Sequence, residues 1–195
     1  MTKSLKGSKT ANNLLTAFAG ESQARMRYTY YAKQAKKDGY VQIKAIFEET
    51  ARNEEEHAKR FMKFLAEDLE GEALKVEWDF PVALADTASN LLSAAEGEHE
   101  EFVSMYPGYA DVAEEEGYPM VAKAFREIAT VERRHEERYR KLLQNIKDGT
   151  VFKKEAPTLW KCDNCGYVYE GEEAPQVCPA CLHKQEYFEL FVENY

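Results

Sequence analysis

Residues 41–70 read VQIKAIFEETARNEEEHAKRFMKFLAEDLE, and this stretch decides the fold. It is rich in Ala, Glu, Lys and Leu, which favour helices, and Gly71 follows it as a stop signal. The predicted inward positions are Ile43, Phe47, Thr50, Glu54, His57, Phe61 and Phe64. The apolar face is therefore interrupted near its middle by a carboxylate and an imidazole. A long amphipathic helix is expected that carries both groups into a core.

The same pattern returns in residues 118–147, where Glu132 and His135 interrupt the apolar face. The predicted inward positions there are Val121, Phe125, Ile128, Glu132, His135, Tyr139 and Leu142. Two further helical stretches also have predicted inward positions. In the first they are Leu14, Phe18, Glu21, Arg25 and Tyr28. In the second they are Leu84, Ala88, Leu91, Ala95, Glu98, Glu101 and Met105. Glu21 precedes Glu54 by 33 residues and Glu98 precedes Glu132 by 34, so this part of the chain is an internal repeat.

The helix limits predict an antiparallel four-helix bundle with two short turns and one longer connection. The expected elements are helices at Thr10–Lys37, Val41–Glu70, Val82 to at least Tyr106 and Tyr118–Lys147, with Gly71–Pro81 as the crossover. Pro107-Gly108 is expected to kink or end the third helix. Asp148-Gly149 is a helix stop, after which the sequence turns to Pro, Gly, Cys and aromatic residues. We expect one domain at residues 1–150 and a second at 151–195.

Four carboxylates and two imidazoles at one depth of a bundle form the ligand set of di-iron or di-manganese proteins. The predicted ligands are Glu21, Glu54, His57, Glu98, Glu132 and His135, with Glu101 as a seventh. An unpaired ionised carboxylate in a core costs several kcal/mol, and four together also repel one another. Two divalent cations offset most of that charge, and oxygen and imidazole ligands suit iron or manganese.

Some of these residues also have simpler explanations. One Glu-x-x-His motif on a Glu-rich helix is weak, because a solvated face explains it, as it does for Glu55, Glu56, Glu136 and Glu137. Two copies of the motif, each on the apolar face of its helix, favour a metal site instead. Glu101 has Ala24 as its counterpart in the repeat, so it makes the two metal positions inequivalent, or it is a rim carboxylate bonded to lysine or arginine. Tyr28 and Tyr106 occupy equivalent places and either donate hydrogen bonds to ligand carboxylates or simply pack the core.

Four cysteines lie in a 20-residue window as two Cys-x-x-Cys pairs: Cys162, Cys165, Cys178 and Cys181. Twelve residues separate the pairs, and four thiolates at that spacing are a strong metal signal. Zinc ribbons share the spacing, so iron and zinc both remain open. The expected small core consists of Tyr167, Tyr169, Tyr187, Phe188 and Phe191. So small a core needs the metal to hold it together.

The composition limits the classes of partner. The chain has 195 residues, 44% of them hydrophobic, and a net charge of −9, which disfavours nucleic-acid binding. No stretch approaches a membrane span, and the polar start Met1–Thr10 predicts no signal peptide, so we expect a cytoplasmic protein. No Gly-x-Gly-x-x-Gly motif is present, so a nicotinamide cofactor is expected to be used by another protein.

The bundle motifs and the cysteine pairs together resemble the rubrerythrin family, in which a ferritin-like di-iron bundle precedes a rubredoxin-like domain. The segments that carry the resemblance are residues 17–25 (AFAGESQAR), 56–60 (EHAKR) and 178–181 (CPAC). The resemblance covers essentially the whole chain. One departure from free rubredoxins is the short interval of twelve residues between the cysteine pairs, together with Leu182-His183 after the last cysteine, where glycine is common.

The resemblance implies a di-iron site of Glu21, Glu54, Glu98, Glu101, Glu132 and His135, with iron at the four cysteines. It implies that His57 replaces Glu101 on reduction. It further implies peroxidase activity that reduces hydrogen peroxide to water, with electrons from a rubredoxin or an NAD(P)H-dependent reductase. A homodimer is implied, in which each cysteine-bound iron serves the partner's di-iron site. The rival interpretations are a ferroxidase that uses oxygen and a non-enzymatic zinc-ribbon protein.

Overall fold

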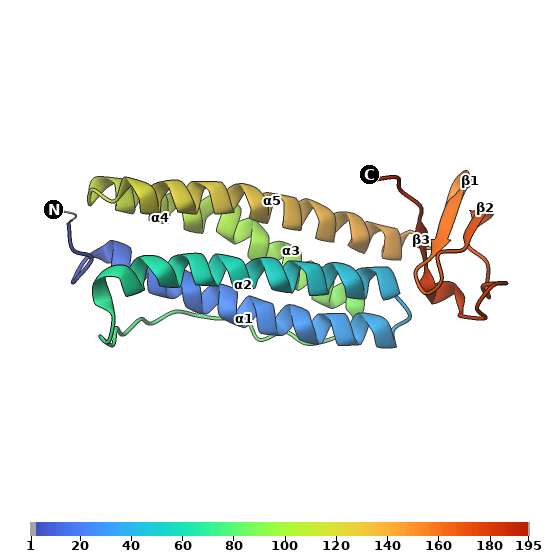
Figure 1. Cartoon of the computed structure of the whole chain (residues 1–195), viewed down its shortest axis with the longest axis horizontal. Helices are drawn as coiled ribbons and strands as arrows, with labels where there is room; N and C mark the ends of the chain where they lie inside the picture. The colour runs from blue at the N-terminus through green and yellow to red at the C-terminus, as the bar shows by residue number, and fades with distance from the viewer. Residues whose placement is uncertain (1–2, 195) are drawn as a thin grey trace.

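Four helical rods lie side by side along the long axis of the molecule, and a small sheet follows them at one end (Figure 1). The structure is a computed structural model that describes residues 3–194. Its helices are α1 (Lys9–Lys37), α2 (Val41–Leu69), α3 (Thr87–Glu100), the π-helix η1 (Glu101–Met105), α4 (Tyr106–Glu115) and α5 (Pro119–Lys147). The segments α3, η1 and α4 follow one another without a break and form one rod. The predicted antiparallel four-helix bundle is confirmed.

The ends of the helices follow local signals in the sequence. Ser8 caps α1, because its hydroxyl accepts a hydrogen bond from the backbone N–H of Ala11. Helices α1 and α5 each end at an Asp-Gly pair, and Gly39 and Gly149 have φ angles of 87° and 66°. Glycine adopts this left-handed conformation without the clash that a Cβ would cause. The turn between α1 and α2 and the end of α5 therefore lie where the sequence predicts them.

Each half of the bundle fastens the start of a helix in the other half. Asp38 accepts hydrogen bonds from the backbone N and Oγ1 of Thr87 at 3.0 and 2.6 Å, at the start of α3. Glu116 accepts the equivalent pair from Thr10 at 2.8 and 2.6 Å, at the start of α1. A carboxylate at a helix N-terminus also interacts favourably with the helix dipole. The repeat in the sequence is therefore a repeat in the structure.

The crossover is longer than predicted, and it runs back along the length of the bundle (Figure 1). The prediction that the third helix begins near Val82 is wrong, since α3 begins at Thr87 with Asp86 as its N-cap. Leu84 was expected to face the core, but it is 66% exposed, and Val82 is fully exposed. The cap explains where the helix starts, because the Asp86 side chain accepts a hydrogen bond from the backbone N–H of Ser89. We call residues 70–86 the strap.

The third rod continues through Pro107 and Gly108 to Glu115. The irregularity expected at the proline takes the form of η1, which lies directly before it. A π-helix inserts one extra residue into a helix and is often found at functional sites. Here it begins at Glu101, the residue that breaks the sequence repeat.

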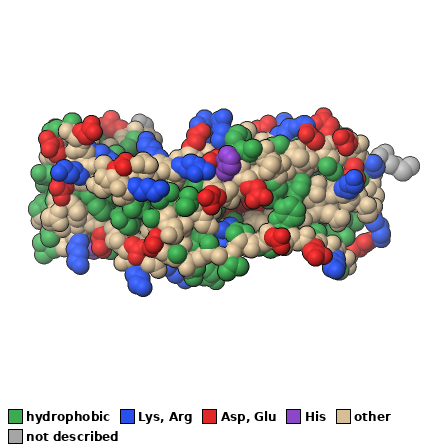
Figure 2. Space-filling view, turned by 180° about the vertical axis from the view of Figure 1, so that it is seen from behind, with side chains coloured by type: hydrophobic (Ala, Val, Ile, Leu, Met, Phe, Trp, Pro, Cys, Tyr) green, Lys and Arg blue, Asp and Glu red, His purple; other side chains and the backbone are tan. Residues whose placement is uncertain are grey.

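Two apolar clusters fill the bundle on either side of its middle. One is centred on Phe61, Tyr106 and Phe125, and the other is centred on Phe47, Tyr28 and Tyr139. The side chains predicted to face inward are buried in large part, but the prediction for Arg25 is wrong. Its guanidinium lies at the surface, 2.9 Å from Glu55. On the face seen in Figure 2, acidic and basic side chains are interspersed, and neither sign gathers into a broad patch.

The C-terminal sheet contains β1 (Lys153–Cys162), β2 (Val168–Glu173) and β3 (Phe188–Leu190), in the order β2-β1-β3, with a 3-10 turn at Gln185–Tyr187. Its core is Trp160, Ala174, Phe188 and two cysteines. Tyr169 was expected in this core, but it is 39% exposed. The sheet meets the bundle where Phe152 stacks on Tyr40, with 6.3 Å between the ring centroids. The limits predicted for the two domains, 1–150 and 151–195, stay a prediction.

Candidate metal centres

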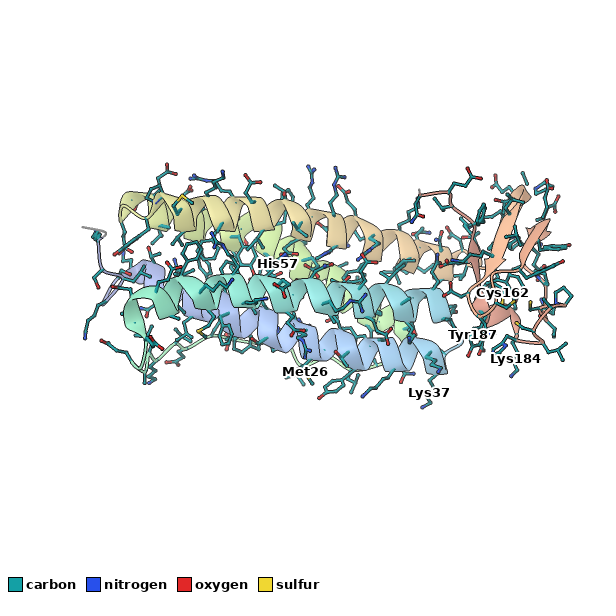
Figure 3. The ribbon with its side chains drawn as sticks, in the orientation of Figure 1. Met26, Lys37, His57, Cys162, Lys184 and Tyr187 are labelled. Carbon is teal, nitrogen blue, oxygen red and sulfur yellow. The ribbon has the colours of Figure 1, made fainter. Side chains whose placement is uncertain are left out.

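The middle of the bundle brings six of the seven predicted bundle ligands together. They form two groups, and within each group the ligand atoms lie within 4.8 Å of one another. The first group is Glu21, Glu54, His57 and Glu132. The second group is Glu54, Glu98, Glu132 and His135. Glu54 and Glu132 belong to both groups, so the two groups share an edge. His57 lies about midway along the bundle (Figure 3).

Both imidazoles face the two shared carboxylates. Nδ1 of His57 lies 3.0 Å from Oε2 of Glu54 and 2.9 Å from Oε1 of Glu132. Nδ1 of His135 lies 2.8 Å from Oε2 of Glu132 and 3.4 Å from Oε1 of Glu54. Each imidazole therefore contacts the glutamate one turn away on its own helix and the shared glutamate of the opposite helix.

The carboxylates are buried and lack enough hydrogen-bond donors. Glu21 and Glu132 are 0% exposed, and Glu54 and Glu98 are 1% exposed. At least one oxygen of each has no hydrogen-bond partner among the described residues, and Nδ1 of His135, though close to Glu132, is not aligned for a hydrogen bond. Buried polar atoms are normally paired, because leaving them unpaired is costly. These orphaned atoms fit a pair of metal ions that accept oxygen and imidazole ligands.

Protons gather at the site when metal is absent. Burial raises the pKa of Glu98 to about 8, and the charge of Glu54 adds to this rise. Burial also raises the pKa of Glu21 well above its usual value, as do the charges of Glu101 and Glu54. Burial alone would lower the pKa of His57, but the close carboxylates of Glu132 and Glu54 outweigh it and raise that pKa to about 10. Metal binding must displace these protons, because metal ligands bind in their deprotonated forms.

The stability of the metal-free bundle is therefore expected to fall as the pH rises. A group with a raised pKa stabilises the fold below its unfolded value, which is 4.5 for Glu98 and 6.5 for His57. That contribution is lost as the pH passes the folded values of about 8 and about 10. Burial alone would raise the pKa of Glu132, but the two imidazoles that face its carboxylate lower that pKa, so Glu132 has the opposite effect on stability only below 4.5.

Urea unfolding of the metal-free chain, followed by far-ultraviolet circular dichroism at about pH 6 and about pH 9, measures this change. The metal-loaded chain is the control, and its stability should rise over the same interval because metal competes with protons for the ligands. A metal-free bundle that gains stability toward pH 9 would contradict the prediction.

Two buried tyrosines donate hydrogen bonds to the carboxylates of the site. The hydroxyl of Tyr28 donates to Oε1 of Glu98 at 2.6 Å, and the hydroxyl of Tyr106 donates to Oε1 of Glu21. Burial raises the pKa of both tyrosines well above the usual value, and the nearby carboxylates add to this effect, so both stay protonated donors. The sequence left open whether these tyrosines donate hydrogen bonds or pack the core, and in the structure each of them does both.

Glu101 is the predicted ligand that lies outside both groups. It is half-buried and faces a pocket between α1, η1 and the strap, lined also by Gln23, Arg27, Trp78 and Tyr106. The Nε and Nη1 atoms of Arg27 are buried there and have no hydrogen-bond partner within residues 3–194. Sequence reasoning missed this pocket, because the strap has no periodicity and Arg27 looks like one more charged residue on a helix.

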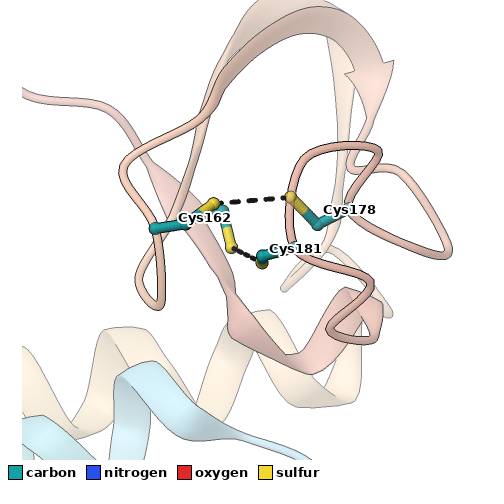
Figure 4. Close-up of side chains that lie close together, drawn as sticks. Cys162, Cys178 and Cys181 are labelled. Atoms are coloured by element: carbon teal, nitrogen blue, oxygen red, sulfur yellow. Dashed lines mark hydrogen bonds between the residues drawn. The ribbon is translucent and has the colours of Figure 1, made fainter.

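The four cysteines form the second centre. Cys162 and Cys178 are 0% exposed, and the sulfurs of the two loops face one another across 3.7 Å, in the pairs Cys162–Cys181 and Cys165–Cys178 (Figure 4). Ligand atoms of all four lie within 4.8 Å of one another. A hydrogen bond from the backbone N–H of His183 lowers the pKa of Cys181 to about 6, as is favourable for a thiolate ligand. The four thiols fit one tetrahedral metal ion.

Leu182, next to the last cysteine, has a φ of 62°, and it is the one non-glycine residue with a positive φ in the described range. This conformation costs roughly 1–2 kcal/mol for a residue with a Cβ, and glycine avoids that cost. Glycine also makes the unfolded chain more flexible, which lowers the free energy of unfolding by roughly 0.5–1 kcal/mol. Because Leu182 is 78% exposed, little packing is lost on its removal. We expect Leu182→Gly to stabilise the cysteine domain by about 1 kcal/mol or less.

Thermal unfolding of the iron-loaded full chain, followed at the thiolate-to-iron absorption, checks this expectation. Leu190→Gly is the matched control, since Leu190 is 38% exposed in β3 and has no positive φ. It should destabilise the domain. Equal loss of stability in both variants would contradict the strain argument.

Comparison with known proteins gives consistent matches. A family model described as rubrerythrin matches residues 12–143, and one described as the rubredoxin-like domain of rubrerythrin matches residues 160–189. The chain is 60% identical to the rubrerythrin of Clostridium perfringens (strain 13 / Type A) over 194 residues, which cover 99% of this chain and 100% of the relative.

Solved structures agree in fold. Fully reduced, all-ferrous nigerythrin is 32% identical with a TM-score of 0.63, and the match covers 97% of this chain and 92% of that one. A bacterioferritin of Desulfovibrio desulfuricans is 24% identical with a TM-score of 0.65 over 73% of this chain and 82% of that one. The bundle is thus ferritin-like.

Proposed function

This chain belongs to the rubrerythrin family, and from this membership and the geometry of the two centres we propose that it reduces hydrogen peroxide to water. Members of the family are iron-based oxidoreductases, and the chain has the side chains for a di-iron site and a four-cysteine iron site. The observation that carries the proposal is the pair of four-ligand groups that share Glu54 and Glu132. Two groups that share two carboxylates would hold two ions close enough for both to contact one small substrate.

The roles of the bundle residues follow from their positions. Glu54 and Glu132 would be shared by the two ions, Glu21 and His57 would complete the ligands of one, and Glu98 and His135 would complete those of the other. Tyr106 and Tyr28 hold the carboxylates of Glu21 and Glu98 in place through their hydroxyl groups. When bound, the iron pair supplies two electrons and a clamp for the two oxygens of peroxide.

Glu101 is the adaptable member of the site. In this structure His57 lies inside its group and the Glu101 carboxyl lies outside both, which is the arrangement that the family resemblance assigns to the reduced site. Glu101 faces the pocket under the strap, so its carboxyl is free to return as a ligand or to deliver a proton. Reduction of peroxide to two water molecules consumes two protons, and Glu101 supplies one of them.

The cysteine site passes electrons and does not bind substrate. Four sulfurs would saturate a tetrahedral ion, whereas the bundle groups offer oxygen and nitrogen ligands. Electrons come from a rubredoxin or an NAD(P)H-dependent reductase in the cytoplasm. The cysteine domain lies at the N-terminal end of α2 (Figure 1), and a rise of about 1.5 Å per residue puts Glu54 roughly 20 Å along that helix. We therefore propose a homodimer in which the cysteine-bound iron serves the partner's site.

Anaerobic purification with metal analysis and stoichiometric peroxide titration tests this function. Protein produced with ample iron should hold one iron for each of the three ligand groups. The reduced bundle pair should be oxidised by one equivalent of peroxide, and faster by peroxide than by dioxygen. A fully occupied preparation with one metal per chain, or a pair that reacts with dioxygen alone, would reject the peroxidase proposal.

A further inference from the structure

A chain of oxidisable side chains leads from the bundle site to the molecular surface. It starts at Tyr106, which is 0% exposed and donates its hydrogen bond to Glu21. The ring of Tyr109 follows, with its centroid 6.5 Å from that of Tyr106. The indole of Trp78 lies 6.4 Å from Tyr109 and is 45% exposed on the strap. Trp78 and Tyr106 also line the pocket over Glu101.

The other half of the repeat has no such exit. Tyr28 is the counterpart of Tyr106, and its ring neighbours Tyr31 and Tyr139 lie 6.0 and 5.6 Å away. All three are buried, and Tyr31 and Tyr139 are 0% exposed. Among the described residues, no exposed tyrosine or tryptophan continues this cluster. Core packing alone predicts aromatic residues in both halves, but it does not require a half-exposed tryptophan on an irregular strap at the end of one of them.

We propose that Tyr106, Tyr109 and Trp78 form a one-electron relay that carries oxidising equivalents from the bundle site to the surface. The inference rests on the proposed peroxidase function, because peroxide is the oxidant. Tyrosine and tryptophan are the side chains with aromatic rings that give up one electron at comparable potentials, whereas phenylalanine does not. Phe125 packs against both tyrosines, at 5.6 and 5.5 Å, yet it takes no part. The relay protects the buried ligands when electrons from the cysteine site arrive too slowly.

The electrons and protons balance as follows. Peroxide needs two electrons and two protons to become two water molecules. When the site can give only one electron, the second leaves the ring of Tyr106, and the phenolic proton passes along the hydrogen bond to the Glu21 carboxylate. An electron from Tyr109 then restores Tyr106, which takes back its proton, while the half-exposed Tyr109 releases a proton to water. Trp78 then gives an electron to Tyr109, which takes a proton back from water, so the net loss is one electron and the indole N–H proton from Trp78. That proton goes to water, and the two protons that peroxide consumes come from Glu101 and from water.

The experiment uses the iron-loaded full chain, chemically reduced and kept anaerobic without an external reductase. It is given more peroxide than its stored electrons can reduce, in the presence of a nitroso spin trap that bonds covalently to carbon radicals. Peptide mass spectrometry then locates the trap, and peroxide consumption is measured in the same samples. The relay predicts trap adducts on Trp78, their loss in Tyr109→Phe, and their retention in Tyr31→Phe.

These variants are matched, since each removes one hydroxyl at the corresponding place of the repeat and keeps the ring. Sulfoxide formed at Met120, which is 62% exposed, reports the direct action of peroxide and should be equal in all proteins. Metal-free chain given the same peroxide should show no adduct on Trp78. Adducts on Trp78 that are equal in Tyr109→Phe and wild type, or absent from wild type that consumes peroxide, would overturn the relay alone. Reduced protein that consumes no peroxide would overturn the relay and the proposed function together.

Discussion

Replacing Cys162 and Cys178 with alanine is expected to abolish peroxide reduction driven by an external reductase, while leaving one turnover of the prereduced bundle intact. These two cysteines are the buried members of the four-thiol group, and without them two sulfurs remain, which do not hold a tetrahedral ion. The bundle ligands belong to separate groups, so the di-iron site still forms. It keeps its two electrons but has no route to receive more.

Stopped-flow absorption at the di-iron band measures both reactions. The double variant, reduced with dithionite, should consume about one peroxide per iron pair, because the reaction takes two electrons. A matched control is Leu182→Gly, which changes the same loop and keeps all four sulfurs. Turnover of the double variant at the wild-type rate with the reductase would show that the cysteine domain does not pass electrons.

Replacing Glu54 and Glu132 with alanine is expected to remove both metals from the bundle and leave the red thiolate chromophore unchanged. These are the shared members of the two groups, so each group falls from four ligands to two. The metal-free variant should also be less stable than metal-free wild type near neutral pH, because the imidazoles of His57 and His135 lose the two carboxylates that they contact in the core. A pair of surface glutamates would give neither effect.

Metal analysis and urea unfolding of metal-free protein measure the two effects. The control replaces Glu55 and Glu137, whose side chains are 54% and 52% exposed, and surface changes of this kind shift stability by about 0.5 kcal/mol or less. It should keep all its iron. A Glu54/Glu132 variant that still binds two metals in the bundle would show that the shared edge is not the ligand bridge.

The sequence predicted the bundle and most ligand positions because both depend on helical periodicity. A helix that must bury one face repeats its apolar residues, so Glu54 and His57 could be placed in the core from their phase alone. Arg25 shows the limit of that argument. Its position lies at the edge of the apolar face, where a long side chain reaches the surface and pairs with Glu55.

The strap and the pocket over Glu101 could not be predicted in the same way. Extended backbone held by single contacts, such as the hydrogen bond from Tyr31 to the carbonyl of Ala83, leaves no period in the sequence. Leu84 therefore looked like part of a helix. The separation of Glu101 from the other ligands depends on a local change in helical winding, and no residue type marks such a change. Its role as a ligand stays a prediction.

The π-helix η1 also bears on how the two halves of the bundle are compared. Glu21 and Tyr28 are seven residues apart, whereas Glu98 and Tyr106 are eight apart, yet both tyrosines donate to a site carboxylate. An alignment of the halves without a gap would pair Tyr28 with Met105 and lose the correspondence from that point onward. A one-residue gap within Glu101–Met105 restores the correspondence. The two halves therefore differ in length by one residue, and the extra residue lies in the π-helix, whose wider turn accommodates it.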